Sequence, residues 1–278
     1  MFSTVKPTEQ SGVAATGSGY QRDLFNSLTG IAARLQRASR VCLLANFDGV
    51  LAPTVPDPSD AAMPPAVRSA LTRLGQNARV CVGIIGHRTV SNLLLNVGLA
   101  GIMYAGNNGL AISGPGFQFV EPVAHSRKEL LNTLTDELAT QLRPIPGVTV
   151  ENRGVTATVH YGRANRDDAL RVQQIASRVV GKNGTLFETA QDHDLVEVRP
   201  RVSWSKGLAA QWMIARTGAP DALPVYLADD SAEADTFQAL GAGITVKVGG
   251  PEDPRAHYYL PEQRQVAEFL DWLASETE

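Results

Sequence analysis

The chain has 278 residues, a formal net charge of −3, and 44% hydrophobic against 19% charged residues. These values are typical of a globular protein and exclude a disordered or fibrous chain, while the weak negative charge gives no electrostatic reason to expect nucleic acid or an anionic membrane as a partner. No run of about 18 apolar residues occurs and the N-terminus lacks the apolar segment of a secretory signal, so we expect a cytoplasmic protein without a membrane span.

The first part of the chain alternates predicted helices and strands. Residues 1–20 are rich in Ser, Thr, Gly and Ala without periodicity, and we expect a flexible tail. Apolar residues at helical spacing predict an amphipathic helix over 22–37. The run 41–46 is apolar on both faces, which predicts a central parallel strand. Helices are then predicted at 64–76 and 88–97, and strands at 79–86 and 102–105.

The middle of the chain has a different pattern. A long helix is predicted at 126–143, and 148–151 and 155–161 alternate as a half-buried antiparallel hairpin. A helix at 166–180 and strands at 185–188 and 194–198 follow. These elements predict an α+β cap domain inserted over 115–200.

The last part returns to the first pattern. Strands are predicted at 225–228 and 244–248, with a helix at 231–240 between them. Strands that alternate with helices form a parallel sheet with helices on both faces. We therefore expect a doubly wound α/β core made of residues 21–114 and 201–278, interrupted by the cap.

Polar residues follow the predicted strands at the edge where an open α/β sheet binds its ligands. They are Asn46, Asp48, the run 86–88, Asp229 and Asp230, with Lys206 opening a helix near the same edge. Carboxylates hold a hard cation through oxygen, and a cation and a lysine neutralise phosphate oxygens. The set indicates a magnesium-assisted phosphoryl-transfer site. The alternative is that these aspartates are turn and helix-cap residues, a common role for one Asp after a strand.

Longer motifs surround these residues. They are Asn-Phe-Asp-Gly-Val-Leu-Ala-Pro-Thr-Val-Pro-Asp-Pro (46–58), Gly-Asn-Asn-Gly-Leu (106–110), Val-Glu-Asn-Arg-Gly (150–154), Val-His-Tyr (159–161), Val-Glu-Val-Arg-Pro (196–200), Trp-Ser-Lys-Gly (204–207) and Tyr-Leu-Ala-Asp-Asp (226–230). Their order and spacing resemble those of trehalose-6-phosphate phosphatases, in the haloacid dehalogenase superfamily, over about residues 40–250.

The resemblance implies a haloacid-dehalogenase-like core and a mechanism. In this family the first Asp of an Asp-x-Asp-Gly-Thr motif attacks the phosphate, and the second protonates the leaving sugar oxygen and then activates water. By position, Asp48 is the expected acid/base and Lys206 the lysine that steadies the phosphate. The expected magnesium ligands are Asn46, Asp48, Asp229 and Asp230, and the expected phosphosugar contacts are Gly49, Arg88, Arg153 and Glu197.

Four positions depart from the family pattern. Asn46 stands at the nucleophile position, and an amide is no usable nucleophile and a weaker metal ligand than a carboxylate. Val50 replaces Thr and Gly86 replaces the Ser of a Ser-Gly-Arg motif, which removes two hydroxyl donors to phosphate. Asn108 stands where a Gly-x-His-Gly-x-Glu motif has His. Three alternative roles are open to His87: a general base, a phosphate-binding cation, or simply a solvated residue at a helix start.

Two functional hypotheses follow. The first is a magnesium-dependent, trehalose-6-phosphate phosphatase-like protein that binds a phosphorylated disaccharide, with reduced activity or activity through a base other than residue 46. The second is a catalytically inactive pseudophosphatase that senses a phosphosugar or regulates a partner such as the sugar-phosphate synthase.

Overall fold

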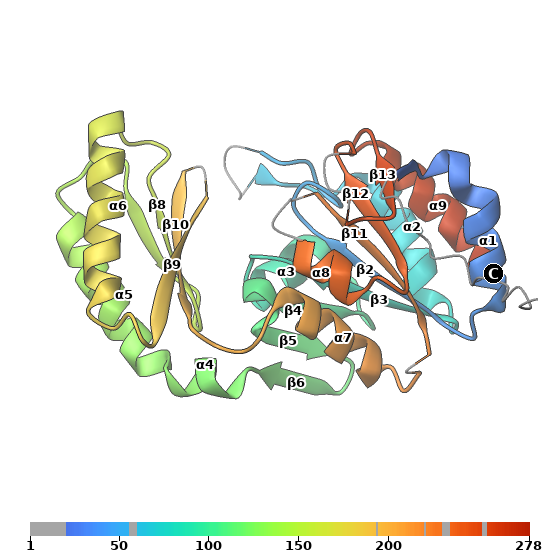
Figure 1. The fold of residues 1–278 in the computed structure, drawn as a ribbon, viewed down its shortest axis with the longest axis horizontal. Coiled ribbons are helices and arrows are strands. Elements are labelled where there is room, and N and C mark those ends of the chain that lie inside the picture. The colour runs from blue at the N-terminus through green and yellow to red at the C-terminus, as the bar shows by residue number, and fades with distance from the viewer. Residues whose placement is uncertain (1–20, 56–59, 193, 220, 230–233, 252–254) are drawn as a thin grey trace, which may run out of the picture.

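The computed structural model describes residues 21–55, 60–192, 194–219, 221–229, 234–251 and 255–278. The predicted tail 1–20 and the predicted metal ligand Asp230 lie outside these residues. The chain forms two lobes, which we call the core lobe and the cap lobe (Figure 1). The core lobe contains a nine-stranded sheet and the cap lobe a four-stranded sheet.

The nine-stranded sheet has the order β1-β13-β12-β11-β2-β3-β4-β5-β6. Its strands are β1 (Arg22–Asp23), β2 (Val41–Asn46), β3 (Val80–Ile85), β4 (Met103–Gly106), β5 (Ala111–Gly114), β6 (Phe117–Val120), β11 (Leu223–Ala228), β12 (Ile244–Val248) and β13 (Tyr258–Leu260). In this order, every neighbouring pair from β1 through β4 is parallel. The pairs β4–β5 and β5–β6 are antiparallel. All six residues of β2 are buried, as expected for a central strand covered on both faces.

Helices cover both faces of this sheet, which confirms the doubly wound α/β fold. One face packs against α1 (Leu28–Arg37), α2 (Pro65–Gln76), α3 (Val90–Val97) and α9 (Gln265–Thr277), and the other against α7 (Lys206–Arg216) and α8 (Ala234–Ala239). The carboxyl ends of the parallel strands therefore form one edge, where loops converge between the two helical layers.

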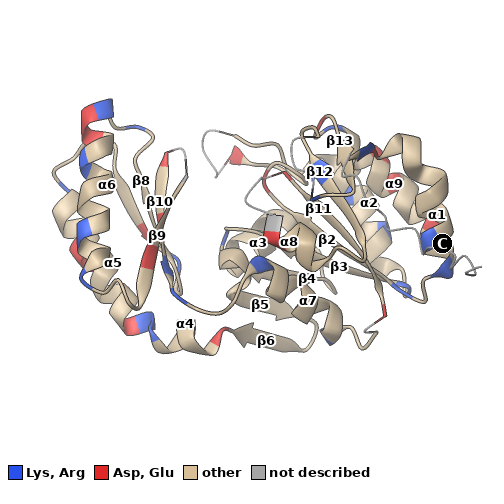
Figure 2. Ribbon diagram, in the orientation of Figure 1, with Lys and Arg blue, Asp and Glu red and all other residues tan. Residues whose placement is uncertain are grey.

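The cap lobe has the strand order β7-β8-β10-β9 and is antiparallel. Its elements are α4 (Pro122–Ser126), α5 (Lys128–Leu142), β7 (Thr149–Asn152), β8 (Ala157–His160), α6 (Arg166–Gly181), β9 (Phe187–Asp192) and β10 (Leu195–Pro200). Val159 and Val196 pack with α5 and α6 in a separate hydrophobic cluster. Because side chains alternate along a strand, the opposite face carries Glu151, Thr158 and Glu197 in register. Figure 2 shows charged residues on the outer helices and on these strands.

Two elements differ from the sequence predictions. Residues 111–120 form the β5–β6 hairpin of the core sheet, so the chain leaves this sheet after Val120 rather than at residue 115. The hairpin turns at Gly116, whose φ is +77°, and Phe119 packs against two core tryptophans. The predicted helix 22–37 begins only at Leu28, because Arg22–Asp23 pairs with β13. Among the described residues, no helix has the length and apolar character to cross a membrane.

Candidate functional site

Asn46 is the last residue of β2, at the carboxyl edge of the core sheet, and is 4% exposed. Its Oδ1 accepts a hydrogen bond of 3.1 Å from the Tyr226 hydroxyl on the neighbouring strand β11. An amide oxygen carries no full charge and the nitrogen lone pair is delocalised. Asn46 therefore offers the site a neutral hydrogen-bonding group and no nucleophile for phosphorus.

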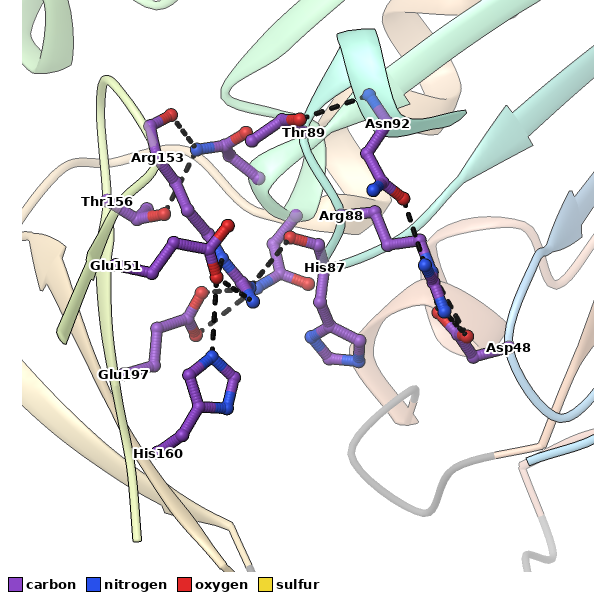
Figure 3. Close-up of polar contacts among 12 residues, drawn as sticks. Asp48, His87, Arg88, Thr89, Asn92, Glu151, Arg153, Thr156, His160 and Glu197 are labelled. Carbon is purple, nitrogen blue, oxygen red and sulfur yellow. Dashed lines mark hydrogen bonds and ion pairs between the residues drawn. The ribbon is translucent and has the colours of Figure 1, made fainter. Parts of the chain in front are cut away.

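Asp48 lies two residues beyond β2 and is paired with Arg88 (Figure 3). The guanidinium donates from Nε to Oδ1 and Oδ2, at 3.1 and 2.9 Å, and from Nη2 to Oδ1 at 2.6 Å. Arg88 is 8% exposed, lies 5.0 Å from the centroid of the Phe47 ring, and donates to Asn92 of α3 at 2.9 Å. Both oxygens of Asp48 accept from a fixed cation, so a leaving group that needs a proton from Asp48 would have to displace that cation.

Asp229 follows β11, and its carboxylate lies against the backbone of Gly49. A Cβ added at Gly49 would fall 1.7 Å from Oδ2 of Asp229. Gly49 also has a φ of +70°, which favours glycine. Both observations require glycine at position 49. This residue, predicted to contact the phosphosugar, here makes room for the carboxylate of Asp229.

Lys247 of β12 is a cation at this edge that the sequence reasoning missed. It is 5% exposed, and its Nζ donates to the carbonyl oxygens of Asp229 at 2.6 Å and Val248 at 2.8 Å. The ammonium therefore lies against the backbone of Asp229, directly after the end of β11. A lysine inside the apolar run 244–248 was the signal that could have identified it.

Lys206 begins α7, and the N-cap Ser205 accepts from the backbone N–H of Leu208 at 3.2 Å. The start of this helix packs against Gly109, where an added Cβ would fall 3.8 Å from the Cα of Lys206. Trp204 fixes the same contact by donating from Nε1 to the carbonyl of Gly109 at 2.9 Å. Lys206 thus starts its helix beside the loop that follows β4, at the carboxyl edge of the sheet.

The remaining departures from the family pattern have different surroundings. Gly86 has open space where a side chain would begin, with no heavy atom within 4 Å of an added Cβ. His87 is exposed, and its carbonyl accepts from Nη1 of Arg153 in the cap at 3.4 Å. Val50 is fully buried in the core cluster, so this side chain packs with apolar neighbours.

The polar face of the cap sheet carries an ion-pair cluster around Glu151 (Figure 3). Its carboxylate accepts from Nε and Nη2 of Arg153 at 3.0 and 2.9 Å and lies 3.3 Å from Nε2 of His160. The hydrogen bond with His160, followed by the hydrogen bond and charge of Arg153, lowers the pKa of Glu151 to about 2. The cluster holds Arg153, whose side chain is 13% exposed, at the boundary between the lobes.

Two asparagines of the loop after β4 join the core lobe to the cap lobe. Asn107 donates to the carbonyl of Arg153 at 2.9 Å and to the Thr156 hydroxyl at 3.0 Å. Asn108 donates to both oxygens of Glu197, at 3.2 and 3.3 Å. Both have positive φ, 53° and 56°, which asparagine tolerates better than most residues. Glu197 is 8% exposed and faces the core lobe. Its contact there is with Asn108, the position where the family pattern has His.

Two of the three described positions of the predicted metal site, Asn46 and Asp48, do not suit a magnesium ion, and only the carboxylate of Asp229 remains as a ligand. Magnesium is usually held by one or two carboxylates together with waters and phosphate oxygens. Here Asn46 is a neutral amide that already accepts from Tyr226, and both oxygens of Asp48 accept from Arg88. Within the described ranges, no group of three or more His, Cys, Asp and Glu side chains is arranged to hold a metal.

The structure brings most of the predicted site residues to the facing surfaces of the two lobes. Asn46, Asp48, Gly49, Arg88, Lys206 and Asp229 lie at the core edge, and Arg153 and Glu197 on the cap face. Arg88 contacts Asp48, which the sequence did not indicate, so its role toward a phosphosugar stays a prediction.

Known proteins resemble this chain in sequence over most of its length. The sequence model of the trehalose-phosphatase family matches residues 44–255. The chain is 32% identical over 247 residues to the trehalose-phosphate phosphatase of Mycobacterium tuberculosis (strain H37Rv), covering 85% of this chain and 62% of that protein. It is 33% identical over 271 residues to that of Mycobacterium avium, covering 92% and 67%. The chain thus spans about three fifths of the length of the M. tuberculosis protein.

Solved structures share the fold. The C-terminal domain of C. albicans trehalose-6-phosphate phosphatase matches with a TM-score of 0.74 and 20% identity, covering 93% of this chain and 99% of that one. The C-terminal domain of the Candida albicans trehalose synthase regulatory protein matches with a TM-score of 0.67 and 12% identity, covering 92% and 100%. At these identities the likeness concerns the fold alone. The family match and the M. avium identity carry the assignment: this chain belongs to the trehalose-phosphatase family.

Proposed function

We propose that this protein binds a phosphorylated disaccharide, trehalose 6-phosphate in the first instance, and does not hydrolyse it efficiently. Family membership supports the ligand class, because the relatives are named trehalose-phosphate phosphatases. The core lobe and the cap lobe are proposed to act as the two domains of such a protein. The phosphate would bind at the core edge near Lys206, and the sugar would bind against the cap.

The observation that carries this proposal is the pairing of Asp48 with Arg88 beside Asn46. Covalent phosphoryl transfer needs a nucleophile and a group that protonates the leaving sugar oxygen. Asn46 cannot supply the first, and both oxygens of Asp48 accept from the Arg88 guanidinium. The two side chains most needed for turnover are thus unsuited to it, whereas Lys206 keeps its place at the helix start.

The polar face of the cap supports binding of a sugar. Arg153 and Glu197 lie at the contact with the core, and Glu151 and His160 flank them on the same sheet. Such side chains donate and accept hydrogen bonds as the hydroxyl groups of a disaccharide require. We propose that Arg153 and Glu197 contact the sugar, which requires Asn108 to release Glu197 or to share it.

The test is phosphate release from trehalose 6-phosphate in the presence of magnesium. We expect the wild-type turnover number to be lower, by a factor on the order of 10⁶, than that of a family member with the nucleophilic Asp. This is the loss caused by removing the covalent nucleophile of another hydrolase. The Asn46→Asp variant is expected to raise the turnover number. Robust wild-type turnover that disappears in Asp48→Ala would instead support an active enzyme that uses Asp48, the other hypothesis derived from the sequence.

Binding is tested separately, by titration of trehalose 6-phosphate into the wild type and Lys206→Ala. Loss of a charged phosphate contact costs about 1.5–3 kcal/mol, so we expect roughly a tenfold to hundredfold weaker affinity in the variant. Lys128→Ala, at the exposed start of α5 in the cap, is the matched control and should bind as the wild type does. Absence of saturable binding to the wild type contradicts the proposed ligand.

A regulatory role toward a sugar-phosphate synthase is a second candidate. It is favoured by the same absence of a nucleophile, together with a fold shared with the domain of a trehalose synthase regulatory protein. This candidate requires that the chain co-purifies with the synthase of its own organism. It also requires that the amount of co-purified synthase changes with the concentration of trehalose 6-phosphate.

A further inference from the structure

The charge balance at the core edge is the starting point for a second proposal, which rests on the proposed phosphosugar function. Among the described side chains this edge carries two anions, Asp48 and Asp229, and three cations, Arg88, Lys206 and Lys247. A family member with Asp at position 46 would have one more negative charge there. The described groups thus leave an excess of one positive charge where the family mechanism places a divalent cation.

The position of Arg88 opposes a metal ion directly. Its guanidinium donates hydrogen bonds to both carboxylate oxygens of Asp48, the atoms that would bind a metal ion. Arg88 is 8% exposed and is held by Phe47 and Asn92, so it cannot move into solvent without losing both contacts. A magnesium ion that used the carboxylate of Asp48 would have to displace this cation or lie close to it, and like charges a few ångströms apart repel each other.

Lys247 of β12 adds a second cation on the Asp229 side of the edge. Lys247 is 5% exposed, and its ammonium donates at 2.6 Å to the carbonyl of Asp229, the residue whose carboxylate lies against Gly49. No carboxylate lies within ion-pair distance of Lys247 among the described residues, so its charge is compensated by carbonyl dipoles. Its field therefore extends to the adjacent ligand site, where it favours an anion and disfavours a dication.

We propose that this protein binds the phosphate group of its ligand without magnesium, with Arg88 and Lys247 providing the positive potential that a bound metal provides in other phosphoryl-transfer sites. A phosphate monoester has a charge near −2 at neutral pH, so the excess of one positive charge among the described groups favours its binding. In this arrangement Lys206 contacts the phosphate, while Arg88 and Lys247 act from behind Asp48 and Asp229 as positioning residues.

The test compares the affinity for trehalose 6-phosphate in EDTA with that in millimolar magnesium chloride, using the full chain. We expect affinities that agree within about twofold. An affinity that rises about tenfold or more with magnesium overturns this inference and leaves the proposed phosphosugar function standing. Absence of binding in both buffers removes the proposed function and this inference with it.

A second measurement tests Lys247 without the phosphosugar. Thermal unfolding is followed with and without magnesium for the wild type, Lys247→Met and the control Lys128→Met. We expect magnesium to leave the unfolding temperature of the wild type and the control unchanged and to raise that of Lys247→Met, because ligand binding to the native state stabilises it. Equal responses in all three proteins contradict the role of Lys247, and if Lys247→Met does not fold, the comparison in EDTA still decides the proposal.

Discussion

The ion pair between Asp48 and Arg88 leads to a quantitative prediction. Breaking a buried pair by removing one partner costs about 3–5 kcal/mol, whereas an exposed pair is worth about 0.2–1 kcal/mol. Arg88 is 8% exposed and Asp48 36%, with three hydrogen-bonding distances of 3.1 Å or less. We therefore expect an intermediate coupling energy of about 2 kcal/mol between the two side chains.

The assay is a double-mutant cycle with Asp48→Asn, Arg88→Gln and the double variant, measured by urea unfolding. Arg88→Gln alone should cost more than the coupling, because Arg88 also loses its contacts with Phe47 and Asn92. Those losses cancel in the cycle. Tryptophan fluorescence reports on the core lobe, since the only tryptophans of the chain are Trp204, Trp212 and Trp272.

The cycle has a clear negative outcome. If the two single substitutions add to within about 0.5 kcal/mol, the side chains are energetically independent. Asp48 would then be available for acid/base chemistry, and the reasoning that leads from this pair to a slow or inactive phosphatase would be refuted.

Three further predictions concern single positions. Gly49→Ala should lower the free energy of unfolding by about 1–3 kcal/mol through its positive φ alone, with more from the clash with the carboxylate of Asp229. The control Gly30→Ala, in α1, should be neutral or stabilising. Equal effects of the two substitutions would contradict the close approach of Asp229 to Gly49. Because the pKa of Glu151 is lowered to about 2, its contribution to cap stability should be present above about pH 4.3 and disappear as the pH falls through 2. The difference in unfolding temperature between wild type and Glu151→Gln should shrink over that range, and a constant difference would refute the ion-pair cluster. Adding Gly86→Ser to Asn46→Asp should increase phosphate release over Asn46→Asp alone, since the space at Gly86 accepts a side chain; no increase would show that the missing hydroxyl is unimportant.

Much of the fold could be predicted because local sequence carries it. The run 41–46 is apolar on both faces, and β2 is indeed buried throughout and lies between β11 and β3. The two-residue strand β1 could not be predicted, because it exists only through pairing with β13 at the far end of the chain. The β5–β6 hairpin was missed for a similar reason, since Phe119 packs against tryptophans that come much later in the sequence.

The site could be predicted as a set of positions and not as a set of interactions. The rule that polar residues after parallel strands converge brought Asn46, Asp48 and Asp229 to one edge. It could not indicate that Arg88 turns toward Asp48 rather than toward a ligand, because that choice depends on packing over Phe47 and a bond to Asn92. The same limit applies to Asn108, whose contact with Glu197 exists only when the lobes meet.

The central claim, binding of a phosphosugar without efficient turnover, is tested most directly by isothermal titration calorimetry of trehalose 6-phosphate into the wild-type protein with magnesium present. Binding without hydrolysis gives heats that saturate at one ligand per chain and a signal that returns to baseline after each injection. Hydrolysis gives a sustained displacement of the baseline as long as substrate remains. We predict saturable heats with full return to baseline, and either a sustained displacement or no saturable heat contradicts the account.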